Sequence, residues 1–215
     1  MLEKFMDGSD ELHAQIVDLL QEIEVYPGIR HELALTACGL AVEHALSLRC
    51  MVRIRCYTSA FSMLRLQYEA LARGVWLLYA ATDSDIEVLA SPLTVNSEQA
   101  AKKMPMFSKI LTQVVEKAPV TASMMLLNFK DVNYHAMNSY VHSGIHPLRR
   151  HAEGYPVKLI QDAVANSNGL NMMTLQLGFV LTGSSDFDEL LKEVQNEYRE
   201  FLPCLTGVSN RRVEN

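Results

Sequence analysis

Charged and imidazole side chains recur at helical spacing in two parts of the sequence. Arg65, Glu69 and Arg73 follow one another at intervals of four, so on a helix Glu69 can form ion pairs with both arginines. Asn138 and His142 show the same interval. Guanidinium groups bind phosphate or carboxylate, and an imidazole can transfer protons near neutral pH. These residue types could therefore bind an anion or perform acid–base chemistry.

Two helices must turn these polar stripes toward each other. Residues 56–81 are apolar or small on nearly every other side, and residues 121–143 have an apolar face opposite the polar one. We expect the stripes to meet in an inter-helix polar seam, with the run Arg149-Arg150-His151 on the connection above it. The predicted anion or ligand site consists of Arg65, Glu69, Arg73, Asn138, His142 and His146.

Two simpler interpretations of the stripes stay open. They could be solvated faces, in which the ion pairs on residues 65–73 contribute about 0.3–0.5 kcal/mol each. They could also form a buried structural network that fixes the register of the helices. If the protein is an enzyme, the candidate catalytic residues are His142, Arg65 and Glu69.

Metal and cofactor chemistry have little support in the sequence. His142 and His146 have the spacing of a zinc-binding helix, but no Glu lies between them, and Gly144 and Pro147 favour a helix end there. No Ser or Cys stands in a nucleophile-elbow pattern, and the ten glycines are scattered rather than gathered in a phosphate-binding loop. We expect neither a metal site nor a cofactor.

The composition is that of a globular protein, with 215 residues of which 49% are apolar and 20% charged. Apolar residues recur at intervals of three and four almost throughout, and strand signals are absent. We predict an all-α, single-domain antiparallel helical bundle over residues 1–206, with about six to eight helices and no sheet. A frayed tail at residues 207–215 should follow it.

The ends of the predicted helices follow from capping and turn residues. Ser9 can cap the first helix, and Gly144 can end the helix at 121–143 in a left-handed conformation. Ser185 and Asp188 have the spacing of a capping box. The other predicted helices span about 30–50, 56–81, 106–117, 157–182 with a break near 168–169, and 186–202; short helices and loops fill 82–105, and residues 145–156 form a connection.

Charge and cysteine content bear on partners and location. A net charge of −6 argues against a bulk polyanion binder, although five arginines between residues 49 and 73 leave room for a local cationic patch. The sequence shows no hydrophobic secretion segment, and the uncharged stretch 163–185 holds too many amides for a membrane span. We predict a cytoplasmic protein that does not contact membranes, with reduced, buried thiols at Cys38, Cys50, Cys56 and Cys204.

Two blocks, residues 59–77 and 138–148, resemble an uncharacterised family of bacterial all-helical proteins that is known mainly as a domain of unknown function. The similarity runs over most of residues 30–182. The resemblance implies that the two polar stripes pair, and it implies no particular activity.

More distantly, the arrangement is similar to HEPN domains, helical bundles that include RNA-cleaving toxins and defence effectors. Their catalytic pattern is an Arg followed, after four to six residues, by a His on the same helix. The nearest form here is Lys130 before His135. The likeness implies a metal-independent ribonuclease in which His142 is the general acid–base and Arg65 or Arg73 stabilises phosphate charge.

Two functions of different class therefore stay open. The first is a non-catalytic or ligand-binding bundle whose polar seam binds a small anion or is structural. Its long apolar helices and eleven methionines favour a homo-oligomer. The second is the HEPN-like ribonuclease of toxin or phage-defence type, whose partner would be RNA.

Overall fold

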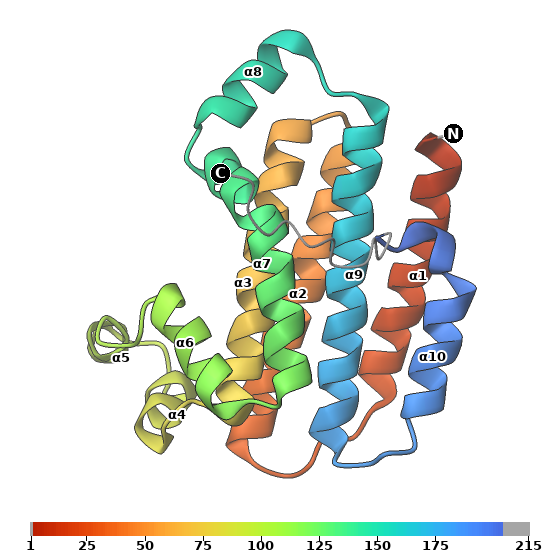
Figure 1. The fold of residues 1–215 in the computed structure, drawn as a ribbon. Coiled ribbons are helices and arrows are strands. Elements are labelled where there is room, and N and C mark those ends of the chain that lie inside the picture. Colours follow the sequence, from red (N-terminus) through yellow and green to blue (C-terminus); the bar gives the residue numbers. More distant parts are fainter. Residues whose placement is uncertain (1, 204–215) are drawn as a thin grey trace, which may run out of the picture.

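Helices make up nearly all of the computed structural model, which describes residues 2–203 (Figure 1). Ten α-helices and one short 3₁₀-helix, with no strand among the described residues, confirm the all-α prediction and exceed the predicted count of six to eight. The predicted tail at 207–215 lies outside the described residues. The elements are α1 (Leu2–Glu22), α2 (Ile29–Arg53), α3 (Tyr57–Tyr79), α4 (Asp83–Ala90), α5 (Val95–Ala101), α6 (Phe107–Lys117), α7 (Val120–Val141), α8 (Ile145–Glu153), α9 (Val157–Thr182), α10 (Asp188–Glu197) and η1 (Arg199–Phe201).

The helix α3 lies at the centre of the bundle, where it packs against α2, α6, α7 and α9. Its nearly uniform apolar surface explains this position, because a helix that is apolar on most sides is stable only when neighbours cover it. Tyr68 and Trp76 are fully buried. Gly74 permits close packing, because a Cβ atom there would lie 2.9 Å from a methyl group of Leu177 on α9.

Two polar residues that suggested helix ends are buried inside helices instead. The helix α1 begins at Leu2, and Ser9 lies in its interior, where its hydroxyl donates to the Phe5 carbonyl at 2.8 Å. The helix α9 runs unbroken past Asn168, whose amide donates to Ser9 Oγ and to the Phe201 carbonyl, both at 2.9 Å. Asn168 therefore ties the first helix to η1 rather than breaking α9.

The connection predicted at residues 145–156 contains the helix α8, which lies across one end of the bundle (Figure 1). The left-handed residue before it is Ser143, with φ of 52°, and Gly144 is the N-cap of α8. Gly144 fits there because a Cβ atom would lie only 2.6 Å from Ser139 Oγ. The predicted capping box at Ser185 is also wrong, since α10 has no side-chain cap hydrogen bond.

The helix α2 is the one helix of the described chain whose length and composition would allow it to span a membrane. Core helices meet the same criterion, and α2 packs along α3 and α9. Its Cys38 is buried, and burial raises the pKa of this thiol to about 12. Cys50 and Cys56 are exposed, contrary to the prediction of buried thiols, and Cys204 lies outside the described residues.

Candidate functional site

Arg65 forms a partly buried contact between α3 and α7. Its Nε donates to Glu69 Oε1 at 2.7 Å, and its Nη2 donates to the Tyr134 hydroxyl at 3.3 Å. The guanidinium carbon lies 4.9 Å from the centre of the Tyr134 ring, a distance at which cation and ring attract. Arg73 is half-buried and forms no ion pair with Glu69.

His142 lies away from this contact. The helices α3 and α7 run antiparallel, since Phe61 touches Tyr140 whereas Tyr68 touches Phe129. His142 follows the Arg65 partner Tyr134 by eight residues, about 12 Å along a helix axis. The antiparallel register places Arg73 still further from His142.

Arg65 therefore contacts α7 at Tyr134, which lies outside the predicted stripe, and not at His142. His142 is the exposed C-cap of α7, and its backbone N–H donates to the carbonyl of the half-buried Asn138 at 3.1 Å. Among the described residues, no hydrogen bond or ion pair joins Arg65, Glu69 or Arg73 to Asn138, His142 or His146.

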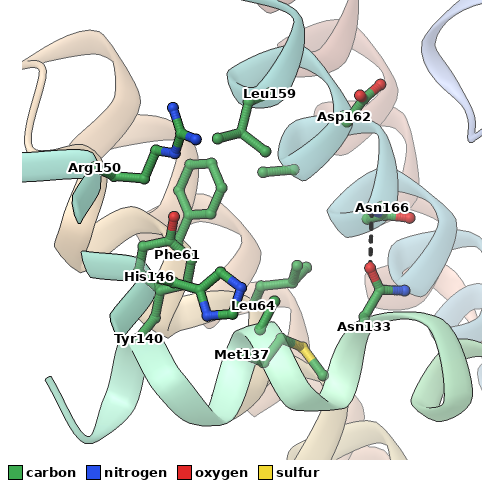
Figure 2. Close-up of a pocket in the computed structure, with 12 residues that line it drawn as sticks. Phe61, Leu64, Asn133, Met137, Tyr140, His146, Arg150, Leu159, Asp162 and Asn166 are labelled. Atoms are coloured by element: carbon green, nitrogen blue, oxygen red, sulfur yellow. Dashed lines mark hydrogen bonds between the residues drawn. The ribbon is translucent and has the colours of Figure 1, made fainter. Parts of the chain in front are cut away.

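A pocket of about 330 Å³ lies between α3, α7, α8 and α9 (Figure 2). Its lining is mainly apolar and includes Phe61, Leu64, Met137 and Leu159. The volume lies at the lower end of the range of small-molecule sites. Of the predicted site residues, only His146 lines this pocket.

Aromatic residues form one end of the pocket. The ring of Tyr140 lies 4.8 Å from that of Phe61 and 6.1 Å from that of His146, centre to centre. Next to them, the hydroxyl groups of Tyr155 and Thr58 lie 2.9 Å apart and share a hydrogen bond. Burial, together with the neighbouring Tyr155, raises the pKa of Tyr140 to about 12, so this phenol stays protonated.

The helix α8 brings a cation to the pocket. Arg150 is half-buried and lines the cavity, and its guanidinium forms no hydrogen bond or ion pair with the described residues. The adjacent Arg149 is paired with Glu153. The α8 helix is held in place by the buried Pro147 and by the His146 backbone N–H, which donates to Ser139 Oγ at 3.0 Å.

The helices α7 and α9 bring a carboxylate and two amides to the pocket. Asp162 is half-buried and pairs with the exposed Lys158 one turn earlier on α9. Asn166 Nδ2 donates to Asn133 Oδ1 at 3.3 Å. Figure 2 shows Arg150 and Asp162 on either side of Leu159, with the two amides on the same side as Asp162.

Sequence reasoning missed most of these residues. The sequence places Arg150 only within a basic run, and it does not mark Asp162, Asn133 or Asn166 as site residues. One signal was present in the sequence, because Asp162 and Asn166 stand four residues apart near the start of a long apolar helix.

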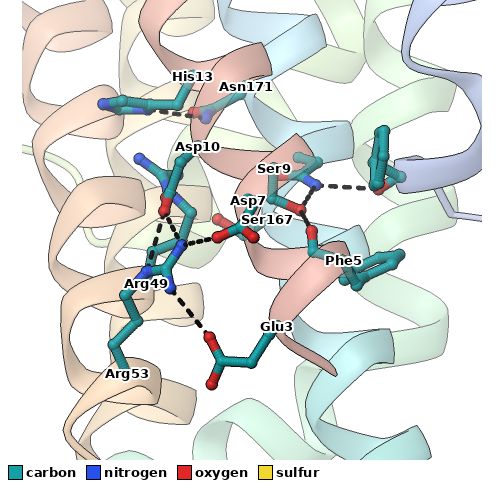
Figure 3. A network of polar contacts seen from close by, with 12 residues as sticks. Glu3, Phe5, Asp7, Ser9, Asp10, His13, Arg49, Arg53, Ser167 and Asn171 are labelled. Carbon is teal, nitrogen blue, oxygen red and sulfur yellow. Dashed lines mark hydrogen bonds and ion pairs between the residues drawn. The ribbon is translucent and has the colours of Figure 1, made fainter. Parts of the chain in front are cut away.

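A separate polar network lies inside the bundle, where α1 meets α2 (Figure 3). Arg49 is only 1% exposed, and its Nε donates to Asp10 Oδ1 at 2.8 Å. Its Nη1 and Nη2 atoms are buried without a hydrogen-bond partner. Nearby, Arg53 pairs with Asp7, Asp10 and, more loosely, Glu3.

This network continues across α9 to α3. His13 Nδ1 lies 3.3 Å from Asn171 Nδ2, and burial, followed by the positive charge of Arg49, lowers the pKa of His13 to about 4. The Gln67 amide donates to Asn171 Oδ1 and to the Ser167 carbonyl, and its own oxygen accepts from the Ser167 hydroxyl at 2.6 Å. A buried polar seam therefore exists, but on the side of α3 away from the predicted one.

In the part of the chain that the structure describes, no group of three or more His, Cys, Asp or Glu side chains is placed to hold a metal ion.

The fold and pocket define an all-helical protein with a candidate small-molecule site. Residues 38–204 match the model of a family of unknown function, DUF6988, so the chain belongs to that family. Every residue that lines the pocket falls within this range, whereas α1 precedes it. No match was found among curated proteins or solved structures. The likeness to HEPN domains and the bacterial origin stay predictions.

Proposed function

We propose that this protein binds a small carboxylic acid with an apolar body in the pocket between α3, α7, α8 and α9. The observation that carries the proposal is Arg150, a half-buried guanidinium that borders an apolar cavity and has no hydrogen bond or ion pair to residues 2–203. Buried or partly buried charges are normally paired, so an unpaired cation at a cavity favours an anionic ligand.

The charge at this end of the pocket favours a carboxylate over a phosphate dianion. Arg150 supplies one positive charge, and Arg149 beside it is already neutralised by Glu153. A guanidinium matches a carboxylate in shape as well as charge, because two parallel N–H groups can donate to its two oxygens. The apolar lining at Phe61, Leu64 and Met137 would then cover the body of the ligand.

The proposal is tested with hexanoate, with 1-hexanol as the uncharged match, by calorimetric titration. We expect hexanoate to bind and Arg150→Ala to weaken its binding about 10–100-fold, the effect of losing a charged hydrogen bond. Arg149→Ala is the matched control and should leave the affinity unchanged. Ala136→Phe should block binding by filling the pocket from α7.

Retained hexanoate binding in both Arg150→Ala and Ala136→Phe would overturn the proposal. So would equal affinity for hexanol and hexanoate in the wild type, or no binding of hexanoate by the folded protein. Circular dichroism and thermal unfolding of each variant show whether the fold is retained.

The ribonuclease hypothesis receives no support from this geometry. It requires an arginine beside His142 to hold phosphate charge, and the arginine of α3 nearest in register, Arg65, is engaged with Glu69 and Tyr134. We therefore do not propose RNA cleavage, and the hypothesis stays a prediction.

Self-association also stays a prediction, with one supporting feature. The outer face of α2 exposes Leu40 and Leu46, and Ile54 follows at its end with 70% of its surface exposed. Sedimentation velocity over a concentration series tests it, with Leu40→Asp combined with Leu46→Asp as the disrupting variant. A wild-type protein that remains monomeric at all concentrations would contradict the prediction.

A further inference from the structure

The pocket carries opposite charges that do not pair with each other. Arg150 from α8 and Asp162 from α9 both line it, and Figure 2 shows them on either side of Leu159. The ion pair that Asp162 forms is with Lys158 on its own helix, and Arg150 has none among the described residues. A protein cation and a protein anion thus face one cavity while remaining apart.

Hydrogen-bond donors and acceptors also lie on different sides of the pocket. The Arg150 side has guanidinium donors, whereas the Asp162 side has acceptors. Asn166 uses its Nδ2 to donate to Asn133, which leaves Asn166 Oδ1 as a second acceptor one turn from Asp162. The hydrocarbon surface of Leu64, Met137 and Leu159 lies within the same pocket.

The pair between Asp162 and Lys158 does not prevent Asp162 from binding a ligand. The side chains are 49% and 77% exposed, and an exposed pair at i, i+4 is worth only a few tenths of a kcal/mol. A carboxylate also has a second oxygen that can accept a hydrogen bond. An ammonium group in the pocket can therefore bind Asp162 without first breaking a strong interaction.

We infer that the ligand of this pocket is a small zwitterion with an apolar middle, whose carboxylate binds Arg150 and whose ammonium group binds Asp162 and Asn166. This inference rests on the proposed function, because it assigns the other end of the same ligand. A molecule with separated charges fits better than one with adjacent charges, because the protein charges lie on either side of Leu159 (Figure 2).

Three six-carbon probes separate the charges experimentally: 6-aminohexanoate carries both, hexanoate only the acid and hexylamine only the amine. We expect 6-aminohexanoate to bind about tenfold more tightly than hexanoate, the usual scale for one additional partly buried charge pair. Asp162→Asn should abolish this preference and leave hexanoate affinity within about twofold. Asp188→Asn on α10, outside the pocket, is the matched control and should keep the preference.

Each outcome decides one statement. If wild type binds hexanoate as tightly as 6-aminohexanoate, the zwitterion inference is wrong and the proposed function stands. A tenfold preference that persists in folded Asp162→Asn would also overturn the inference, because the ammonium group would then bind elsewhere. If neither hexanoate nor 6-aminohexanoate binds, the proposed function itself fails.

Discussion

Polar side chains lie between helices in two regions, the interior seam and the pocket, and their hydrogen bonds and ion pairs differ between the two. In the interior seam, Gln67, Ser167 and Asn171 satisfy one another, so the protein itself supplies both donor and acceptor. In the pocket, Arg150 and Asp162 line one cavity without meeting. Pairing within the protein indicates a structural role for the seam, whereas in the proposed function a ligand completes the bonding of Arg150 at the pocket.

Arg49 and Arg150 illustrate the same difference. Arg49 has its charge matched by Asp10, although its Nη atoms lack partners. These atoms are enclosed by the packing of α1 on α2, whereas Arg150 borders about 330 Å³ of open pocket. An unpartnered donor is therefore informative about ligands only where space for a ligand adjoins it.

The largest expected effect is on stability, from Gln67→Leu in the seam. This substitution leaves the Ser167 hydroxyl and Asn171 Oδ1 without their buried partner and should lower the free energy of unfolding by about 2–4 kcal/mol. Urea denaturation measures it. Gln176→Leu, at an exposed position of α9, is the control and should change stability by less than about 0.5 kcal/mol. A loss of less than about 1 kcal/mol in Gln67→Leu would show that the seam is not needed for stability.

The next effect is on binding and comes from Arg150→Ala. Hexanoate affinity should fall about 10–100-fold while the free energy of unfolding changes by less than about 0.5 kcal/mol, because the Arg150 guanidinium forms no hydrogen bond or ion pair within the described part of the chain. Calorimetry and urea denaturation on the same preparation measure both. A substantial loss of stability would mean that Arg150 supports the fold, and the contrast with the seam would disappear.

A further effect on stability concerns pH and His13. Burial and Arg49 lower the pKa of His13 from 6.5 to about 4, so between these values the unfolded chain binds a proton that the native protein does not. The free energy of unfolding should therefore fall as pH drops from about 6.5 to about 4, by at most about 1.4 kcal/mol per pH unit for this one group. Below pH 4 the contribution should level off.

The measurement is urea denaturation between pH 4 and 7.5. His13→Gln should reduce the slope, and His135→Gln, at an exposed position of α7, should not. An unchanged slope in His13→Gln would show that the imidazole is not neutral in the native seam, where Asp10, Arg49 and Asn171 surround it.

The smallest expected effect is at Arg65, within the site predicted from sequence. Arg65→Met should cost about 0.5–1 kcal/mol, since the pair with Glu69 is partly exposed and the contact with Tyr134 is a single cation–π interaction. Hexanoate affinity should stay within about twofold. A tenfold loss of hexanoate affinity would indicate that the ligand binds near Arg65, in the predicted stripe, and not in the pocket.

The sequence predicted the fold well where apolar patterns alone decide it. The central position of α3 follows from its nearly uniform apolar surface, and the bounds of α9 follow from the turns around it. The register between α3 and α7 does not follow from the apolar pattern of either helix. It depends on which side chains interlock across the two helices. The sequence therefore could not predict whether Arg65 lies beside His142.

The pocket was harder to predict because it depends on α8. Gly144 and Pro147 favour a chain break, and the structure instead uses them as the N-cap and a buried residue in the first turn of a helix. Once α8 forms, His146 and Arg150 share a face at i, i+4 and both line the pocket. The loop predicted at residues 145–156 has no such helical face, so the prediction did not bring His146 and Arg150 together.

The bridge that Asn168 makes between Ser9 and the Phe201 carbonyl has a consequence for how the protein is made. Ser9 and Asn168 are 159 positions apart, so this bridge waits until the ribosome has delivered α9 and η1. Leu12 and Ile16 are fully buried in a cluster with Leu175, Phe179 and Val194, so their burial also requires α9 and α10. A chain that stops before α9, α10 and η1 should therefore leave this face of α1 exposed and open to proteases.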